Sequence, residues 1–203
     1  MEKLTSIEKI SGIDEIESSI IPTGKKIDLA LLLLGKKEAT QLGNFKIPAS
    51  DQERKSIIEE FDEEFQTVIE LIDRLRLPFY IKQRPNEADD IIGFSILVSK
   101  NEEDLARFVE ADTNSDDTTF GLMVGYPKTA VEAYRTKEAF DYETELPEDQ
   151  SNALAHEEGL KPFLHFMSSR EHWLEELAFA RNNRDLIKEK APKLYQEIIH
   201  SSE

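Results

Sequence analysis

Three histidines lie close enough in the sequence to suggest a metal site or an acid–base site. His156, His165 and His172 fall within 17 residues, and Glu171 precedes the last of them. Imidazole and carboxylate groups together are ligands that zinc, manganese and iron accept. No His-Glu-x-x-His spacing places two of these groups on one helical turn, so a metal site would depend on the tertiary structure. The alternative is that the histidines only pack in the core or at the surface.

A second candidate site lies at the beginning of a predicted helix, in the sequence Gly-Tyr-Pro-Lys-Thr. The first turn of a helix has free backbone N–H groups, to which Tyr126, Lys128 and Thr129 add a phenol, an ammonium and a hydroxyl group. Together these groups predict binding of a phosphate or a carboxylate. Pro127 is also a common first residue of an ordinary helix, which is the alternative interpretation. The sequence has neither a phosphate-loop motif nor a Gly-x-Gly-x-x-Gly motif, and no cofactor is predicted.

The acidic segment that begins at Asp112 matches the first half of a calcium-binding loop. Asp112, Asn114 and Asp116 supply oxygen atoms at alternate positions, as such a loop requires. The pattern then fails, because Asp117 stands where glycine is needed and Met123 stands where a bidentate glutamate is needed. The alternative is an acidic connecting loop in which Asp116 or Asp117 caps the next helix.

The net charge of −17 comes almost wholly from three segments, residues 51–76, 101–117 and 141–158. An acidic chain repels phosphate backbones, so nucleic-acid binding is not expected. Acidic helices and loops would instead steer a basic protein partner toward this chain. Solubility is the alternative explanation of the acidity.

The composition excludes several classes of protein. The chain has no cysteine, which rules out disulfide bonds, a thiolate nucleophile, Cys-ligated zinc and iron–sulfur clusters. The most apolar run, Ile27 to Leu34, has eight residues and includes Asp28, whereas a membrane span needs about 20. The first ten residues lack the apolar core of a signal peptide. We therefore expect a cytoplasmic protein that does not associate with membranes.

The clearest predicted element is a helix from about Ser50 to Leu75. Ser50 and Glu53 form a capping-box pattern, and apolar residues follow at three- and four-residue steps. The periodicity changes at Pro78, where the helix must have ended. Residues 79–82 and 91–99 are then typical of the two strands of an antiparallel hairpin.

The other predicted elements are shorter. We expect helices at residues 2–20 and 27–34, followed by a loop or a short helix at 38–48. Asn101 caps a helix that ends before the acidic loop 112–117, and residues 118–125 form either a third strand or a short helix. Further helices begin at about residues 127 and 147, at Ser168, where Glu171 completes a capping box, and after Pro192. Residues 161–167 read as a strand.

These elements predict an α+β fold, with a small antiparallel sheet of about three strands surrounded by several helices. The length of 203 residues fits one domain, 1–203, with a helical N-terminal part, 1–76, and an α+β part, 77–203. A strand edge left open between residues 79 and 99 would be the place for a homodimer to form.

Two functional hypotheses follow. In the first, the chain is an acidic binding protein that engages a basic partner or a small ligand. In the second, it is a metal-dependent or general acid–base enzyme, similar in chemistry to a hydrolase, that uses the region His156–His172 while Lys128 and Thr129 hold an anionic group of the substrate. A single pocket shared by these two regions would favour the enzyme.

Overall fold

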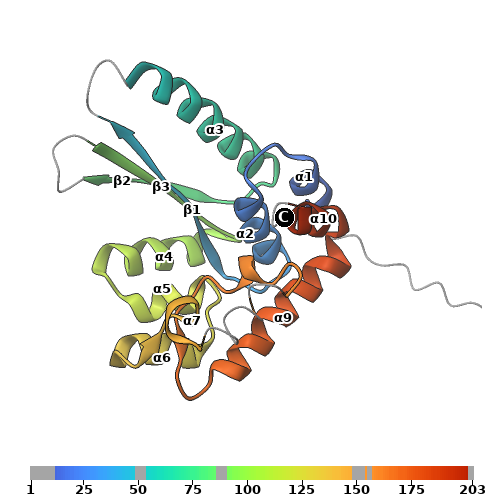
Figure 1. Cartoon of the computed structure of the whole chain (residues 1–203). Helices are drawn as coiled ribbons and strands as arrows, with labels where there is room; N and C mark the ends of the chain where they lie inside the picture. Colours follow the sequence, from blue (N-terminus) through green and yellow to red (C-terminus); the bar gives the residue numbers. More distant parts are fainter. Residues whose placement is uncertain (1–11, 49–53, 86–90, 148–153, 155–156, 201–203) are drawn as a thin grey trace, which may run out of the picture.

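The chain folds around a three-stranded antiparallel sheet with the strand order β1-β3-β2 (Figure 1). This computed structural model describes residues 12–48, 54–85, 91–147, 154 and 157–200. The strands are β1 (Ala39–Pro48), β2 (Phe79–Pro85) and β3 (Ile91–Ser99). A second, two-stranded sheet joins β4 (Ala139–Phe140) to β5 (Ser168–Ser169). The predicted α+β class is therefore confirmed, as is the β2–β3 hairpin.

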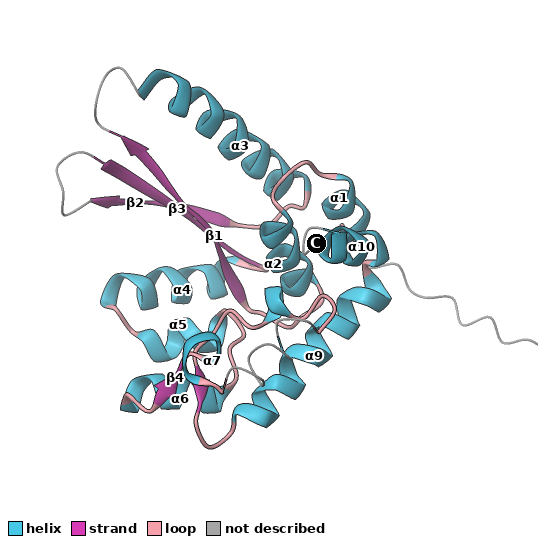
Figure 2. Cartoon of the chain, in the orientation of Figure 1, coloured by secondary structure: helices cyan, strands magenta, loops and turns pink. Residues whose placement is uncertain are grey.

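Helices surround the sheet on both sides (Figure 2). The first part of the chain contributes α1 (Ile13–Ser18), α2 (Thr23–Leu33) and α3 (Arg54–Arg74). The middle contributes α4 (Glu102–Asn114), α5 (Asp117–Met123), α6 (Lys128–Thr136) and α7 (Tyr142–Glu145). A short 3-10 helix, η1 (Lys161–Phe163), precedes α9 (Trp173–Lys190) and α10 (Pro192–His200). The predicted start of the long helix and the helix predicted near residue 147 fall largely outside the described residues.

The central strand β3 divides the core into two layers, because successive side chains point to opposite faces of a sheet. Ile96 and Val98 belong to the larger cluster, which α2, α3, α9 and α10 complete. Leu97 points the other way and packs with Phe108 of α4. Hence α3 and α4 lie on opposite faces of the sheet, as Figure 1 shows.

Strand β1 replaces the loop or short helix predicted for residues 38–48. It pairs with β3 from Ala39 to Pro48, and a bulge between Leu42 and Asn44 shifts the register at Gly43, whose φ is +84°. The extra residue interrupts the alternation of apolar and polar side chains that marks a strand in the sequence. One strand of the sheet therefore comes from a segment for which no strand was predicted.

The predicted strand at residues 161–167 was also wrong. Residues 161–163 form η1, and the chain continues without strand pairing until β5, which pairs with β4. Proline suits the first turn of a helix and lacks the N–H that a strand ladder needs, and Pro162 stands in the first turn of η1. The helix predicted from Ser168 begins five residues later, at Trp173. In the turn before it, the Ser169 hydroxyl accepts hydrogen bonds from the backbone N–H groups of Glu171 and His172.

Residues 112–117 do not form the predicted acidic loop. Helix α4 continues to Asn114, and α5 begins at Asp117 after a turn at Ser115, whose φ is +54°. The segment 118–125, which was compatible with a strand or a helix, is mostly α5. Asp116 caps it by accepting a hydrogen bond from the Thr119 N–H at 3.1 Å.

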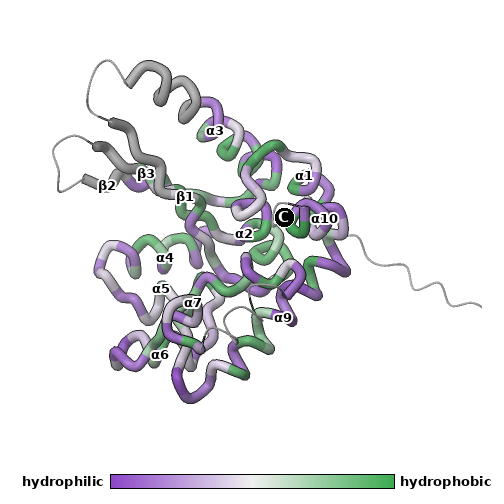
Figure 3. Tube along the Cα trace, in the orientation of Figure 1, coloured by the Kyte–Doolittle hydropathy of each residue, from purple (hydrophilic) through white to green (hydrophobic). Residues whose placement is uncertain are grey.

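Hydrophobic segments gather at the centre of the molecule around α2, and hydrophilic ones lie on the outer sides of α4 and α6 (Figure 3). None of the helices among the described residues has the length and apolar composition needed to cross a membrane.

Candidate functional site

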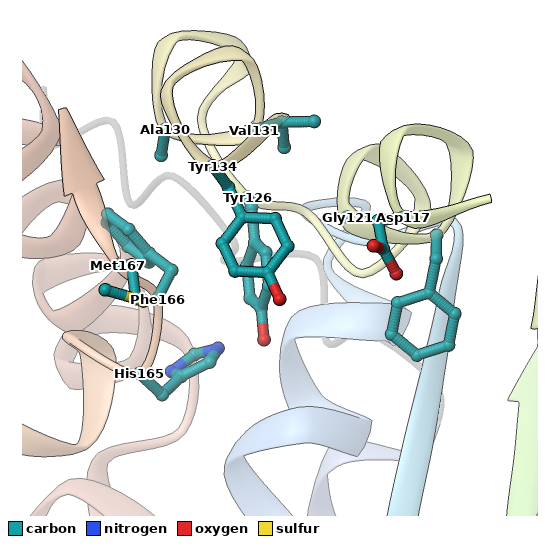
Figure 4. Close-up of a pocket in the computed structure, with 10 residues that line it drawn as sticks. Asp117, Gly121, Tyr126, Ala130, Val131, Tyr134, His165, Phe166 and Met167 are labelled. Carbon is teal, nitrogen blue, oxygen red and sulfur yellow. The ribbon is translucent and has the colours of Figure 1, made fainter. Parts of the chain in front are cut away.

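Residues from two distant segments line a pocket of about 280 Å³, which we call the α5–α6 pocket (Figure 4). One segment is α5, α6 and the turn between them, and the other is the stretch that follows η1. The lining residues are Asp117, Phe120, Gly121, Tyr126, Ala130, Val131, Tyr134, His165, Phe166 and Met167. The pocket therefore brings Tyr126 and His165 together, which the sequence placed in two different sites.

Gly125 sets the position of the turn between α5 and α6. Its φ of +82° is rarely adopted by residues with a side chain. A Cβ atom at this position would lie 2.5 Å from the Lys36 carbonyl oxygen, so the two backbone segments touch directly. The contact holds Tyr126 against the segment that follows α2.

A second close approach joins the two helices of the pocket. A Cβ atom on Gly121 would lie 2.9 Å from a methyl carbon of Val131, which leaves room for hydrogen only. The Tyr126 N–H donates to the Gly121 carbonyl at 2.9 Å and closes the turn. The wall formed by α5 and α6 is thus determined by two glycines that permit close packing.

Aromatic rings form the inner side of the pocket. The ring centroid of Tyr126 lies 5.6 Å from that of His165 and 5.8 Å from that of Phe166. Phe166 in turn meets Phe179 of α9 edge-on at 6.4 Å. Figure 4 shows the His165 ring beside the Tyr126 phenol, with Phe166 and Met167 on one side and Asp117 on the other. These contacts are in the range at which aromatic pairs attract one another.

His165 is held as a neutral base that faces the pocket. Its Nδ1 lies 3.2 Å from the Pro162 carbonyl oxygen, so Nδ1 must carry the proton and donate it, and Nε2 keeps its lone pair. Burial lowers the pKa of His165 below its ordinary value, and the positive charge of Lys37 lowers it further, against the opposing effect of Asp28. The residue is nevertheless exposed to solvent, although it lies among many protein atoms. A ligand in the pocket can therefore reach a neutral imidazole.

An ion pair between Lys37 and Asp28 lies near Tyr126 and His165 of the pocket. The buried Lys37 ammonium pairs with the Asp28 carboxylate on α2. Burial raises the pKa of Tyr126, and the negative charge of Asp28 adds to this effect, so its phenol stays protonated. The phenol is thus available as a hydrogen-bond donor. Asp28 was noted in the sequence only as the one charge within an apolar run, and that isolated charge was the signal that could have revealed this support.

The structure gives Thr129 an internal partner. Its hydroxyl donates to the Glu176 carboxylate at 2.6 Å, and the Ser169 N–H donates to the other oxygen of the same carboxylate at 2.9 Å. Glu176 is 1% exposed. Lys128 is exposed and does not line the α5–α6 pocket, whereas Tyr126 does. Of the three residues predicted to hold an anion, one faces the pocket, and the hydroxyl of a second binds a carboxylate of the protein itself.

The predicted cation-binding residues occupy three different settings. Asp112 lies in α4, where its carboxylate pairs with Lys82 of β2 at 2.5 Å. Asn114 is the last residue of α4, and Asp116 is the cap of α5. Because α4 continues through Asp112 and Asn114, these side chains follow the spacing of a helix and not that of a calcium loop.

Two of the predicted metal ligands, His165 and His172, have different surroundings. His165 lies in the α5–α6 pocket, while His172 directly precedes α9, with Nδ1 3.5 Å from Glu175 and Nε2 4.0 Å from Glu171. Within the described ranges, no group of three His, Asp or Glu side chains could hold a metal ion. His156 lies outside those ranges, so the metal site remains a prediction.

Two of the three acidic segments lie on opposite faces of the sheet. Most of segment 51–76 is α3, on one face of the sheet, and most of 101–117 is α4, on the other face. In the segment 141–158, Glu145 pairs with Arg170, and Glu157 accepts hydrogen bonds from Arg181 and Arg184. A rigid partner that covers α3 would not cover α4 as well.

Comparisons with protein families, with curated proteins and with solved structures give no significant match to this chain.

Proposed function

We propose that the α5–α6 pocket binds a small organic cation with an ammonium group. The observation that carries this proposal is the make-up of the pocket wall. Its aromatic rings include Phe120, Tyr126, Tyr134 and Phe166. With His165 neutral, Asp117 is the one lining residue in the described part of the chain that carries a formal charge. The negative faces of aromatic rings and a carboxylate both attract a cation.

The size and the wider charge support the same class of ligand. A volume of about 280 Å³ is at the lower end of the range for ligand pockets, so the ligand has few atoms. Lys37 lies behind His165, but its ammonium is paired with Asp28 and does not leave a free positive charge at the wall. The net charge of −17 raises the local concentration of cations around the protein.

Titration calorimetry with choline tests the proposal, with 3,3-dimethyl-1-butanol as the control. The two molecules have nearly the same shape, but the second has carbon in place of the charged nitrogen. We expect choline to bind and the neutral compound to bind at least tenfold more weakly. Equal affinities, or no binding of choline, tetramethylammonium and propylammonium, would contradict the proposal.

Two neighbouring aspartates provide matched variants. Asp117→Asn removes the carboxylate that lines the pocket, and we expect it to weaken choline binding about tenfold. Asp116→Asn removes one charge from the preceding residue but keeps a side chain that caps α5, and we expect no change. If both variants weaken binding equally, the effect comes from net charge and not from the pocket.

Acid–base catalysis is a second candidate, which one observation favours. Tyr126 and His165 meet in one pocket, with a protonated phenol beside an imidazole whose Nε2 is free to accept a proton. Hydrolysis of p-nitrophenyl acetate between pH 5 and 8 tests this candidate. We expect the rate to rise through a pKa below 6.5 and to be lost in His165→Gln. An unchanged rate in that variant would exclude His165 as the base.

A further inference from the structure

The outer edge of β2 lies beside α4, and the two elements enclose a groove of about 540 Å³, which we call the β2–α4 groove. Phe79 and Tyr80 line it from the strand, and Leu105 and Val109 line it from the helix. Figure 1 shows α4 running along the sheet on the side opposite to α3. In the part of the chain that the structure describes, β2 pairs with β3 alone, so no strand covers this edge.

The register of the sheet determines which backbone groups β2 presents at this edge. The Ser99 N–H donates to the Pro78 carbonyl at 3.2 Å, and Phe79 stands opposite Val98. Bonded and non-bonded pairs alternate along an antiparallel ladder, so Tyr80 is bonded to β3, whereas the N–H and C=O groups of Phe79 and Ile81 point away from it. These outward groups form the pattern to which another strand can bond.

The side chains at this edge are apolar and accessible. Tyr80 is 46% exposed and Ile81 is 40% exposed. Proteins usually protect such an edge with an inward-pointing or exposed charge. Lys82 is the charge nearest to these residues on β2, and it is held by Asp112 of α4. The edge at Phe79 to Ile81 is therefore open to an extended segment.

The negative charge of the groove favours a segment with basic side chains. Glu102 and Glu110 line it, and neither forms an ion pair with the described residues. Helix α4 carries five acidic residues and one basic residue, Arg107, which lies near Asp104 and Glu38. A segment with Lys or Arg side chains would be attracted by these carboxylates, whereas a second copy of a chain with net charge −17 would be repelled.

We infer that the β2–α4 groove binds an extended, basic segment of a partner protein, which adds to the sheet as a fourth strand beside β2. Its backbone bonds to Phe79 and Ile81, its apolar side chains cover Tyr80 and Val109, and its cationic side chains reach Glu102 and Glu110. This mode of recognition obtains affinity from backbone hydrogen bonds and specificity from alternate side chains. The inference is independent of the α5–α6 pocket.

Fluorescence polarisation with a defined peptide pool tests the inference. The pool contains capped nine-residue peptides in which Lys or Arg alternates with Val, Leu or Tyr, and the control pool has Glu in place of Lys and Arg. We expect only the basic pool to bind, with an affinity that falls as salt is raised from 50 mM to 500 mM. No binding of the basic pool, or equal binding of both pools, overturns the inference.

Substitution of Ile81 tests strand addition itself. Ile81→Pro removes the outward N–H without removing a bond to β3, which edge strands tolerate. Ile81→Val keeps that N–H and is the matched control. We expect at least tenfold weaker binding for the proline variant and less than a twofold change for valine, with both variants folded as judged by circular dichroism. Unchanged binding by a folded Ile81→Pro protein overturns strand addition.

A second measurement is available if the proline variant does not fold. Amide NMR shifts of Phe79 and Ile81 are then followed in the unaltered protein as peptide is added. Shifts confined to other residues overturn strand addition.

Substitution of α4 residues tests the charge. Glu110→Gln removes a carboxylate that lines the groove, and Glu103→Gln removes one that is exposed on the same helix outside the groove. We expect about threefold weaker binding and a reduced salt dependence for the first and no change for the second. If Glu110→Gln and Glu103→Gln weaken binding equally, the cationic side chains of the segment do not contact the carboxylates of the groove, and that part of the inference is overturned. A doubled mass in native mass spectrometry that Ile81→Pro abolishes would assign the edge to a second copy and overturn the basic partner.

Discussion

The α5–α6 pocket and the β2–α4 groove differ in how many parts of the chain build them. The pocket needs α5, α6 and residues 165–167, and it also needs Lys36, Lys37 and Asp28 behind it. The groove needs only a strand edge and the helix that follows the β2–β3 hairpin. The pocket is thus formed by contacts between residues far apart in the sequence, whereas the groove is formed by elements that are close in the sequence.

This difference determines how each site responds to substitution. Two groups that support the pocket, Lys37 and Glu176, are buried and bonded, so their loss lowers stability and ligand affinity together. Tyr80, Ile81 and Glu110 at the groove are not buried, so their replacement changes binding with little effect on stability. Four predictions test this contrast.

The largest effect is expected for Gly125→Ala. The added Cβ would lie 2.5 Å from the Lys36 carbonyl oxygen, at a residue whose φ is +82°. Both strain and collision lower the free energy of unfolding, by about 2–4 kcal/mol in total. Urea denaturation measures this loss, and choline titration would show weaker binding. Gly24→Ala is the control, because a Cβ there meets no atom within 4 Å and α2 is helical, so we expect unchanged or slightly raised stability.

The next effect concerns the buried carboxylate beside the pocket. Glu176→Ala leaves the Thr129 hydroxyl and the Ser169 N–H without their acceptor, so we expect a loss of about 2–3 kcal/mol in the free energy of unfolding. Glu175→Ala removes an exposed carboxylate from the same helical turn and should change stability by less than about 0.5 kcal/mol. If both variants lose the same stability in thermal or urea unfolding, Glu176 contributes only as a negative charge near the N-terminus of α9, and its two hydrogen bonds add nothing.

A smaller effect is expected where β2 is joined to α4. Lys82→Met removes the partner of the partly buried Asp112, and we expect a loss of about 1 kcal/mol in the free energy of unfolding. Arg135→Ala breaks an exposed pair with Glu132 within α6 and should leave stability almost unchanged, because water screens the pair. If Lys82→Met also weakens binding of the basic peptide pool more than twofold, the pair sets the width of the groove.

The smallest effect on stability is expected from pH. The pKa of His165 is lowered in the folded protein, so between that lowered value and 6.5 the unfolded chain binds more protons than the folded one. Stability from this group is therefore fully present above pH 6.5 and decreases as the pH falls through this window. A protonated His165 would also repel the ammonium ligand, so choline should bind more weakly at pH 5 than at pH 7.5. His165→Gln, measured by urea unfolding and choline titration at both values, should remove these differences from the wild-type profile.

Sequence reasoning succeeded where the signal is local. The apolar period of α3, the Asn101 cap of α4 and the breaks at Pro78 and Pro192 all act within one or two helical turns, and each predicted a boundary or an element close to the one observed. Errors occurred where partners far away in the sequence decide the structure. The bulge at Gly43 interrupts the alternating pattern of β1, so the sequence did not predict that strand. The aromatic run around Pro162 was compatible with a strand, but in the structure it begins with the 3-10 helix η1.

The candidate sites follow the same division. The sequence named Tyr126 and His165, but in separate roles, and it assigned Lys128 and Thr129 to a ligand although the hydroxyl of Thr129 bonds to Glu176. The sequence predicted a strand edge between residues 79 and 99 and an acidic segment at 101–117, but not that the acidic helix α4 lies beside the edge of β2.

The acidity, the lack of cysteine, the α+β class and the main helices could all be predicted from the residues, because composition and short-range periodicity are independent of how the chain folds back on itself. Which side chains meet depends on the tertiary structure. Tyr126 and His165 are 39 positions apart, and they share a pocket because Gly125 lets the chain touch Lys36 and because residues after η1 pack beside α6. Such contacts depend on the backbone positions of distant segments, which no local pattern encodes.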